Sequence, residues 1–267
     1  MTTTFALHPS ASKTLIAHAV ARLPQVQSAL NAGKIFIGHG TTNIAVAQAL
    51  LDMKVERPEQ YVAGVVTGQV ACITNPASRM QPWCLDHGAA LKTDWLDFIK
   101  SFQSGDIFIK GANAVDPSGR VGILMANEYG GTIGQAIGTL KARGTEIIVP
   151  VGLEKLIPSC TEAQKGLGID RTEIRLGVPV GYMVLDNITL VTEIESLKIL
   201  YGIDAAMIGG GGVGGMEGAV ILAADCPSEQ QAHDLLHEIK ELNRQKPLFI
   251  DKTPCKDCLT PCDFIRK

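Results

Sequence analysis

The sequence predicts an α/β fold in which a mainly parallel, Rossmann-like sheet carries helices on both faces. Short apolar runs that end at glycine alternate with stretches of helical period. The clearest unit is the apolar run 34–38, which is followed by a glycine- and threonine-containing turn and then by a helical pattern over 44–51. Ligands of such sheets bind beyond the carboxyl ends of the strands, so a site is expected at that edge.

The other elements follow in order along the chain. A helix over residues 12–31, interrupted at Pro24, precedes the first strand, and residues 1–10 are expected to be a polar terminus. Residues 68–93 are expected to form loops with short elements. Further strands are expected at 61–67, 106–110, 146–151, 180–186, 188–192, 205–209 and 219–224, and further helices at 95–102, 130–143, 193–201 and 228–245. No linker is visible, so residues 1–250 are predicted to form a single domain and residues 251–267 a cysteine-containing tail.

Composition excludes several classes of function. The 267 residues are 46% hydrophobic and carry a formal net charge of -3, which gives no electrostatic reason to bind nucleic acid. The amino terminus has no basic segment followed by an apolar run, so no signal peptide is expected. Apolar runs reach about 6 to 8 residues, far short of the roughly 20 of a membrane helix. We therefore expect a cytoplasmic protein that binds a small anionic molecule, forms a homo-oligomer, and contacts neither membrane nor nucleic acid.

The first candidate motif follows the strand at 34–38. Its glycines allow a sharp turn that exposes backbone N–H groups, and the next helix adds its positive end. Phosphate or carboxylate binding is one interpretation, and a plain turn with a threonine cap is the other. The sequence is neither a Walker loop nor a dinucleotide fingerprint. The candidate ligand-binding residues are Gly38, His39, Gly40, Thr41, Thr42 and Asn43.

The second motif follows the strand at 106–110 and continues into a glycine-rich helix start. It places Lys110 and the carboxylates of Asp116 and Glu128 after a strand end, where a carboxylate can move a proton or act as a nucleophile. The alternatives are a surface ion pair for Lys110 and a turn role for Asp116, which precedes a proline. Candidate binding residues in this motif are Gly111, Asn113, Gly130 and Gly131.

The third motif is a run of six glycines within residues 209–215. Glycine loses more conformational freedom on folding than other residues, so packing alone does not explain the run. Close approach of a ligand, or of a neighbouring chain, to the backbone is one interpretation and a mobile loop is the other. Gly210, Gly211 and Gly212 are the candidate contacts.

The fourth motif is the C-x2-C-x3-C spacing of Cys255, Cys258 and Cys262, flanked by prolines. Three such thiols can converge on zinc or on an iron–sulfur cluster, which requires a fourth ligand. That ligand could be a distant cysteine, His233, His237 or a group of a partner chain. Redox or disulfide pairing, and no role at all, remain alternatives. The other four cysteines are scattered at positions 72, 84, 160 and 226.

Taken together, the first two motifs resemble those of the ribose-phosphate isomerase, glucosamine-phosphate deaminase and CoA-transferase superfamily, which includes the sensor domains of DeoR-type repressors. The stretch from Gly119 through the run ending at Lys155 is also similar to methylthioribose-phosphate isomerase and the related initiation-factor subunits. The resemblance covers residues 34–155. Asn113 stands where this superfamily has an acid, which leaves Asp116 as the nearest carboxylate. The cysteine tail has no counterpart in these members.

Three functions follow from this resemblance. The first is an isomerase- or lyase-type enzyme acting on a small sugar-phosphate-like anion, in which Asp116 or Glu128 moves a proton and Lys110 stabilises an enolate. The second is a CoA-transferase-like enzyme with a CoA thioester as substrate and Glu128 as nucleophile, since Glu128 precedes a Tyr-Gly-Gly turn. The third is a non-catalytic ligand or metal sensor, which the asparagine at position 113 favours.

Overall fold

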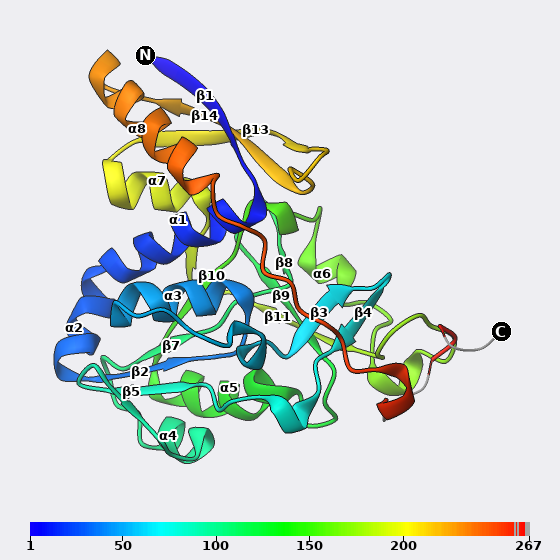
Figure 1. The fold of residues 1–267 in the computed structure, drawn as a ribbon. Coiled ribbons are helices and arrows are strands. Elements are labelled where there is room, and N and C mark those ends of the chain that lie inside the picture. The colour runs from blue at the N-terminus through cyan, green and yellow to red at the C-terminus, as the bar shows by residue number, and fades with distance from the viewer. Residues whose placement is uncertain (259, 261, 265–267) are drawn as a thin grey trace.

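A computed structural model describes residues 1–258, 260 and 262–264 (Figure 1). Its centre is a six-stranded sheet of order β12-β10-β7-β2-β5-β6. Four of these strands run parallel in the order of the chain: β2 (Lys34–Ile37), β7 (Ile107–Ile109), β10 (Glu146–Pro150) and β12 (Thr189–Val191). The α/β prediction is therefore confirmed.

Helices cover both faces of this sheet, as the sequence predicts. Ile35 and Ile37 of β2 face a core shared with α1 (Pro9–Arg22), α2 (Pro24–Ala32) and α3 (Thr41–Leu51). Phe36, between them, faces the opposite core, which contains residues of α4 (Trp95–Lys100) and α5 (Gly131–Arg143). Phe36 stacks on Phe108 of β7 with ring centroids 4.9 Å apart. This alternation is what a strand buried on both faces requires.

Within the main sheet, those four strands are the ones that pair in parallel. β5 (Trp83–Asp86) pairs antiparallel with β2, and β6 (Ala89–Leu91) pairs antiparallel with β5. The short strand β3 (Gly64–Thr67), predicted to begin at Tyr61, pairs with β4 (Val70–Ile73) in a hairpin outside the main sheet.

A second, three-stranded sheet of order β1-β14-β13 pairs the amino-terminal strand with strands late in the chain. β1 (Thr2–Leu7) was missed by the sequence prediction, which treated these residues as a polar terminus. Its partner β14 (Ala219–Asp225) supplies the pairing that makes the threonine-rich segment a strand. β13 (Asp204–Gly211) pairs antiparallel with β14, and α7 (Glu193–Tyr201) and α8 (Glu229–Leu242) complete this layer at the top of Figure 1.

Residues between β7 and α5, together with a segment that follows β10, form a third sheet. It consists of β8 (Ala114–Val115), β9 (Val121–Met125) and β11 (Gly181–Leu185), all antiparallel. The prediction that 180–186 is a strand is confirmed, whereas β8 and β9 were not predicted. The helix α6 (Cys160–Ala163) and single 3-10 turns (Pro58–Tyr61, Pro76–Ser78, Leu153–Lys155, Ile169–Arg171 and Cys255–Asp257) complete the structure.

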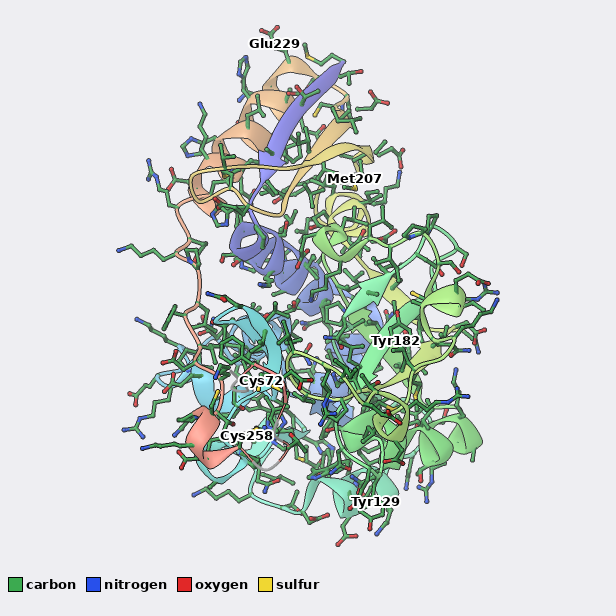
Figure 2. The ribbon with its side chains drawn as sticks, turned by 90° about the vertical axis from the view of Figure 1, so that its right-hand side faces the viewer. Cys72, Tyr129, Tyr182, Met207, Glu229 and Cys258 are labelled. Carbon is green, nitrogen blue, oxygen red and sulfur yellow. The ribbon has the colours of Figure 1, made fainter. Side chains whose placement is uncertain are left out.

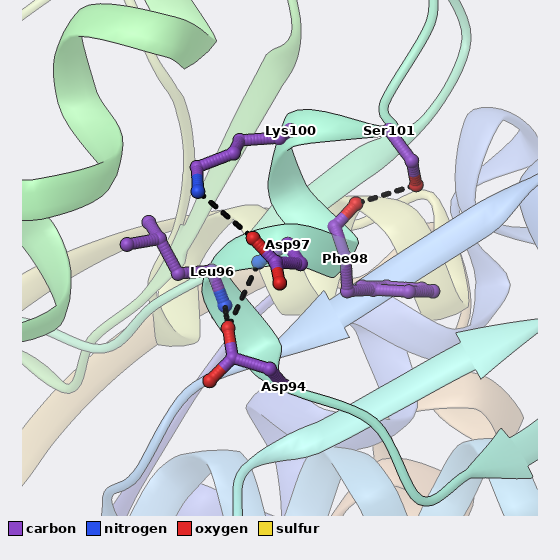
Figure 3. A network of polar contacts seen from close by, with 6 residues as sticks. All are labelled: Asp94, Leu96, Asp97, Phe98, Lys100 and Ser101. Carbon is purple, nitrogen blue, oxygen red and sulfur yellow. Dashed lines mark hydrogen bonds and ion pairs between the residues drawn. The ribbon is translucent and has the colours of Figure 1, made fainter.

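Local capping explains where several helices begin. Asp94 Oδ1 accepts hydrogen bonds from the backbone N–H groups of Leu96 (2.9 Å) and Asp97 (3.0 Å) at the start of α4 (Figure 3). Lys100 Nζ donates to Asp97 one turn later, at 2.8 Å. Thr192 and Glu195 form a reciprocal capping box at the start of α7.

The two hydrophobic clusters connect these layers. The first contains Phe5 and Val220 of the small sheet together with Phe36 and Phe108 of the main sheet, so both sheets share a core. Ile250, near the tail, belongs to the second cluster. Among the described residues, no helix combines the length and apolar character needed to cross a bilayer.

Candidate functional site

The four parallel strands end at one edge of the main sheet, and polar segments follow each of them. These segments are 38–43 after β2, 110–113 after β7, 152–155 after β10 and 192–193 after β12. The carboxyl ends of parallel strands lie side by side, so the four segments form a single site. The sequence predicts the first two and misses the last two.

The amino-terminal turn of α3 has unpaired backbone donors. Gly40 caps the helix without a side-chain hydrogen bond and has φ 149°, a conformation that side chains rarely adopt. Its own N–H donates to the Tyr61 carbonyl at 2.9 Å. Within the described chain, no acceptor is present for the backbone N–H groups of Thr41, Thr42 and Asn43. These three donors and the helix dipole favour an anion.

Asn43 fixes the shape of this turn from inside. The side chain is fully buried, and Nδ2 donates to the Gly38 carbonyl at 2.8 Å. Oδ1 has no hydrogen-bond partner among the described residues. It lies 3.6 Å from where a Cβ on Gly111 would stand, so it points toward the loop after β7.

Lys110 lies directly over the first loop. A Cβ on Gly38 would stand 2.8 Å from Lys110 Cδ, so any other residue at position 38 would require the lysine side chain to shift. Lys110 Nζ donates to the Gly111 carbonyl at 3.2 Å, and Lys155 Nζ donates to the next carbonyl, that of Ala112, at 3.1 Å. Burial and then the charge of Lys155 lower the pKa of Lys110 to about 8. Two ammonium groups on successive carbonyls repel each other, and an anion between them would relieve that repulsion.

His39 adds a neutral polar group beside these cations. Its Nε2 lies 2.8 Å from the Met80 carbonyl, which can only accept, so Nε2 carries the proton and Nδ1 is left as an acceptor. Burial lowers the pKa of His39, and Arg79 and Lys110 lower it further.

A pair of carboxyl groups lies on the other side of Lys155. Glu193 is fully buried, and its Oε2 accepts from the Leu153 N–H at 2.9 Å. Glu193 Oε1 and Glu154 Oε2 have no hydrogen-bond partner within the described residues. Both oxygens lie against Gly152, where a Cβ would overlap Glu154 Oε2 and stand 3.1 Å from Glu193 Oε1. Burial and then the charge of Glu154 raise the pKa of Glu193 to about 7. Glu193 is therefore suited to bind a proton near neutral pH.

Two cations accompany this carboxyl pair. Glu154 Oε1 is 3.9 Å from Lys155 Nζ. Burial lowers the pKa of Lys13, on α1, and outweighs the nearby charge of Glu154, which raises it. The site therefore combines a cationic half at Lys110 and Lys155 with a proton-binding half at Glu154 and Glu193.

The carboxylate of Asp116 is occupied by structural hydrogen bonds. Oδ1 accepts from the Ser118 N–H and hydroxyl and from the Arg120 N–H, and Oδ2 accepts from the Cys160 N–H. Burial raises the pKa of Asp116, but these hydrogen bonds outweigh burial and leave it below the ordinary value. The geometry favours the turn role for Asp116 over a role as a base.

Glu128 and Asn113 lie apart from the buried groups. Glu128 is exposed and makes no hydrogen bond or ion pair with any described residue. Asn113 is also exposed, and its Oδ1 accepts from the Leu124 N–H at 3.0 Å. Gly130 and Gly131 begin α5 with φ of 75° and 59°, and a Cβ on Gly130 would stand 2.8 Å from Gly134 Cα. Backbone conformation and close packing therefore explain why glycine stands at these two positions, independently of any ligand.

The glycine run lies outside the main sheet. Gly210 and Gly211 end the edge strand β13, and Gly212 opens its hairpin with φ 123°. A Cβ on Gly212 would overlap the Met216 carbonyl oxygen, which explains glycine there by close backbone approach. The far end of the hairpin nevertheless reaches the site, because a Cβ on Gly218 would stand 3.9 Å from Glu154 Cβ.

The three tail cysteines line a small cavity beside the hairpin β3–β4. Cys72 of β4 lines the same cavity, whereas His233 and His237 lie exposed on α8 and do not line it. A separate open groove of 590 Å³ lies between α1, α3, α7 and α8, and the ionisable side chains that line it include His18, Arg22 and Glu238.

No protein-family model matches the chain, and no curated protein matches it significantly in sequence.

Sequence reasoning missed Glu154, Lys155 and Glu193 as site residues. A signal was present, because each comes within five residues of the end of a strand that the sequence predicts. What the sequence lacks is the order of the strands. Only that order places the ends of β10 and β12 next to those of β2 and β7.

Proposed function

We propose that this protein is an enzyme that binds a small phosphorylated or carboxylated compound at the carboxyl edge of the main sheet and transfers a proton on it. The reaction class is that of an isomerase or lyase acting on a sugar-phosphate-like substrate. The fold would then be a Rossmann-like member of the ribose-phosphate isomerase and CoA-transferase superfamily, with the antiparallel sheets as additions.

One observation carries the anion part of this proposal. Three unpaired N–H groups at the start of α3 and the amine of Lys110 gather around the loop 38–43, with Lys155 alongside. A phosphate group offers the charge and the several acceptor oxygens that these donors require. His39 Nδ1 can in turn accept from a substrate hydroxyl.

The carboxyl pair supports the proton-transfer part. A general base works best when its pKa is near the ambient pH, and the pKa of Glu193 is raised to about 7. Lys155 lies between this pair and Lys110 and can stabilise negative charge that develops on a carbonyl oxygen. We therefore assign the proton-transfer role to Glu193 with Glu154, in place of Asp116 or Glu128.

The CoA-transferase alternative receives less support. Its nucleophile would be Glu128, which is exposed and interacts with no described residue. An attacking carboxylate is normally held by neighbouring groups. The sensor alternative shares the anion site and differs only in the absence of turnover.

The test has a binding arm and a chemical arm. Inorganic phosphate is titrated calorimetrically into the wild type, Lys110→Met and, as a matched control, Lys100→Met, whose lysine is exposed on α4. We expect Lys110→Met to weaken binding about tenfold or more, which corresponds to about 1.4 kcal/mol, and Lys100→Met to leave it unchanged. Equal affinities in all three proteins would exclude this anion site.

The chemical arm follows deuterium incorporation from D2O into a panel of aldose and ketose phosphates by NMR. We expect exchange at the carbon next to the carbonyl in the wild type and none in Glu193→Gln, with phosphate binding retained. Exchange that persists in Glu193→Gln would remove Glu193 as the base. Binding without exchange for every compound would establish the sensor instead.

A further inference from the structure

Four of the seven cysteines meet at a single cavity. Cys72 lies on β4, while Cys255, Cys258 and Cys262 belong to the tail, and all four line a cavity of 20 Å³ together with Lys252 and Gly177. Figure 2 shows Cys72 and Cys258 on neighbouring segments that are far apart in the sequence. All four are free thiols and only partly buried.

Backbone contacts bring the segments together without help from the thiols. The N–H and hydroxyl of Thr253 donate to the Ile73 carbonyl at 2.8 and 3.0 Å. The Val178 N–H donates to the Ala71 carbonyl at 3.0 Å, and the Asp263 N–H donates to the Arg175 carbonyl at 3.0 Å. Cys72 therefore faces the tail because of main-chain pairing on both sides of it.

The tail has little apolar burial to hold it in place. Between positions 250 and 264, Ile250 and Thr253 are the described residues that are buried, and the only regular element is the 3-10 turn at Cys255–Asp257. Ordering a loop-rich segment costs conformational entropy that such a small apolar contact does not offset. Small loop-rich segments of this kind are commonly held by disulfides or by a metal.

Hydrogen-bond donors lie close to two of the tail sulfurs, as they do around metal-bound thiolates. Lys252 Nζ lies 3.0 Å from Cys255 Sγ, and the Gly177 N–H donates to Cys262 Sγ at 3.3 Å. Hydrogen bonds to sulfur from ammonium and amide groups are typical partners of metal-bound thiolates.

We propose that Cys72, Cys255, Cys258 and Cys262 form a four-thiolate metal site that binds either zinc or an iron–sulfur cluster. Within residues 1–258, 260 and 262–264, no three His, Cys, Asp or Glu side chains already stand in metal-binding geometry. The sulfurs point instead toward local partners, such as the Thr260 carbonyl, which lies 3.4 Å from Cys258 Sγ. Binding therefore requires rotation of the thiols toward the cavity and release of their protons.

The remaining cysteines differ from these four in environment. Cys84, Cys160 and Cys226 are buried, at 1%, 0% and 1% exposure, and they lie in separate elements. The odd total of seven thus divides into four cysteines at one cavity and three isolated core residues. Cys226 serves as a matched control, since its loss removes one thiol elsewhere.

The test is metal analysis of the full-length chain, produced in medium supplemented with zinc and iron and purified without air. We expect about one zinc per chain, or about four iron with four acid-labile sulfide and a broad visible absorbance. Cys72→Ser should lose more than half of the bound metal, whereas Cys226→Ala should keep it. Retention of full metal content in Cys72→Ser would exclude Cys72 as the fourth ligand.

A second measurement uses the wild type alone and does not depend on the folding of a variant. Alkylation with iodoacetamide, read by mass spectrometry before and after chelation, should show these four cysteines protected together and released together. A folded wild type that contains neither metal after supplementation would overturn the proposal, as would a disulfide between any two of the four.

Discussion

Replacing Glu193 with glutamine should stabilise the protein, and the gain should grow as the pH rises. Glu193 is fully buried, and two causes, burial and the charge of Glu154, act against its ionised form. A glutamine keeps an acceptor oxygen for the Leu153 N–H. Its NH2 group can also donate to Glu154 Oε2, which has no partner among the described residues.

The magnitude follows from the pKa of Glu193, which rises from 4.5 to about 7 on folding. Below pH 4.5 the group is protonated in both states and makes no contribution. Between these two values the unfolded chain releases its proton first, so the folded state binds more protons and stability falls as the pH rises. The resulting penalty in the wild type is about 1 kcal/mol at pH 5 and about 3 kcal/mol at pH 7 and above.

The assay is urea unfolding of the wild type and Glu193→Gln at pH 5, 6, 7 and 8, at constant ionic strength and without phosphate. The difference in free energy of unfolding should rise by about 2 kcal/mol across this range. In a thermal scan, each 1 kcal/mol corresponds to about 2–4 °C in Tm. The control is Glu162→Gln, whose carboxylate is exposed on α6 and paired with Lys165, and its effect should not vary with pH.

A flat difference between pH 5 and pH 8 would refute this reasoning. So would a Glu193→Gln protein that is less stable than the wild type at pH 8. Either result would mean that groups other than a bound proton offset the cost of burying the Glu193 carboxyl. The raised pKa would then no longer support Glu193 as the base.

Three further predictions concern other parts of the molecule. Lys110, whose pKa is lowered to about 8, should be acylated at pH 7 before the exposed Lys100, since about a tenth of Lys110 is neutral at that pH. Inorganic phosphate should slow the acylation of Lys110. Equal acylation rates for the two lysines would contradict the lowering of the Lys110 pKa by burial. Gly212→Ala should lower the free energy of unfolding by about 1–3 kcal/mol. The control Gly138→Ala lies at a helical position with open space and should raise the free energy of unfolding by up to about 1 kcal/mol. Similar urea midpoints for the two variants would be inconsistent with the hairpin geometry. Asp116→Asn should lower the thermal midpoint through lost hydrogen bonds and leave deuterium exchange intact, so selective loss of exchange would restore Asp116 as the base.

Local sequence was sufficient for the elements that depend on local signals. The strand at 34–37 and the loop after it were predicted because an apolar run ends at glycine and a helical pattern follows at once. The helix α7 was predicted with its observed bounds, and the structure shows a capping box of Thr192 and Glu195 at its start. Anion binding at 38–43 stays a prediction, to which the structure adds Lys110 as a neighbour.

Elements that depend on distant partners were not accessible in the same way. β1 forms because β14, more than two hundred residues away, pairs with it from Thr2 to Leu7. The sequence did not show that the glycine run belongs to the second sheet, since an apolar strand followed by glycine looks alike in parallel and antiparallel contexts. β9 was missed because its pairing with β11 spans about sixty residues.

The sequence by itself determined the α/β class, most of the helices, and the positions at which polar residues follow strands, because these features depend on periodicity, caps and turns within a few residues. Tertiary structure alone decided which of those positions meet. It placed Glu193 and Glu154 beside Lys155 and Lys110 through the order β12-β10-β7-β2, and it brought Cys72 to the tail through main-chain pairing. Strand order and long-range pairing arise from burial and hydrogen bonding summed over the whole chain, and no short segment encodes them.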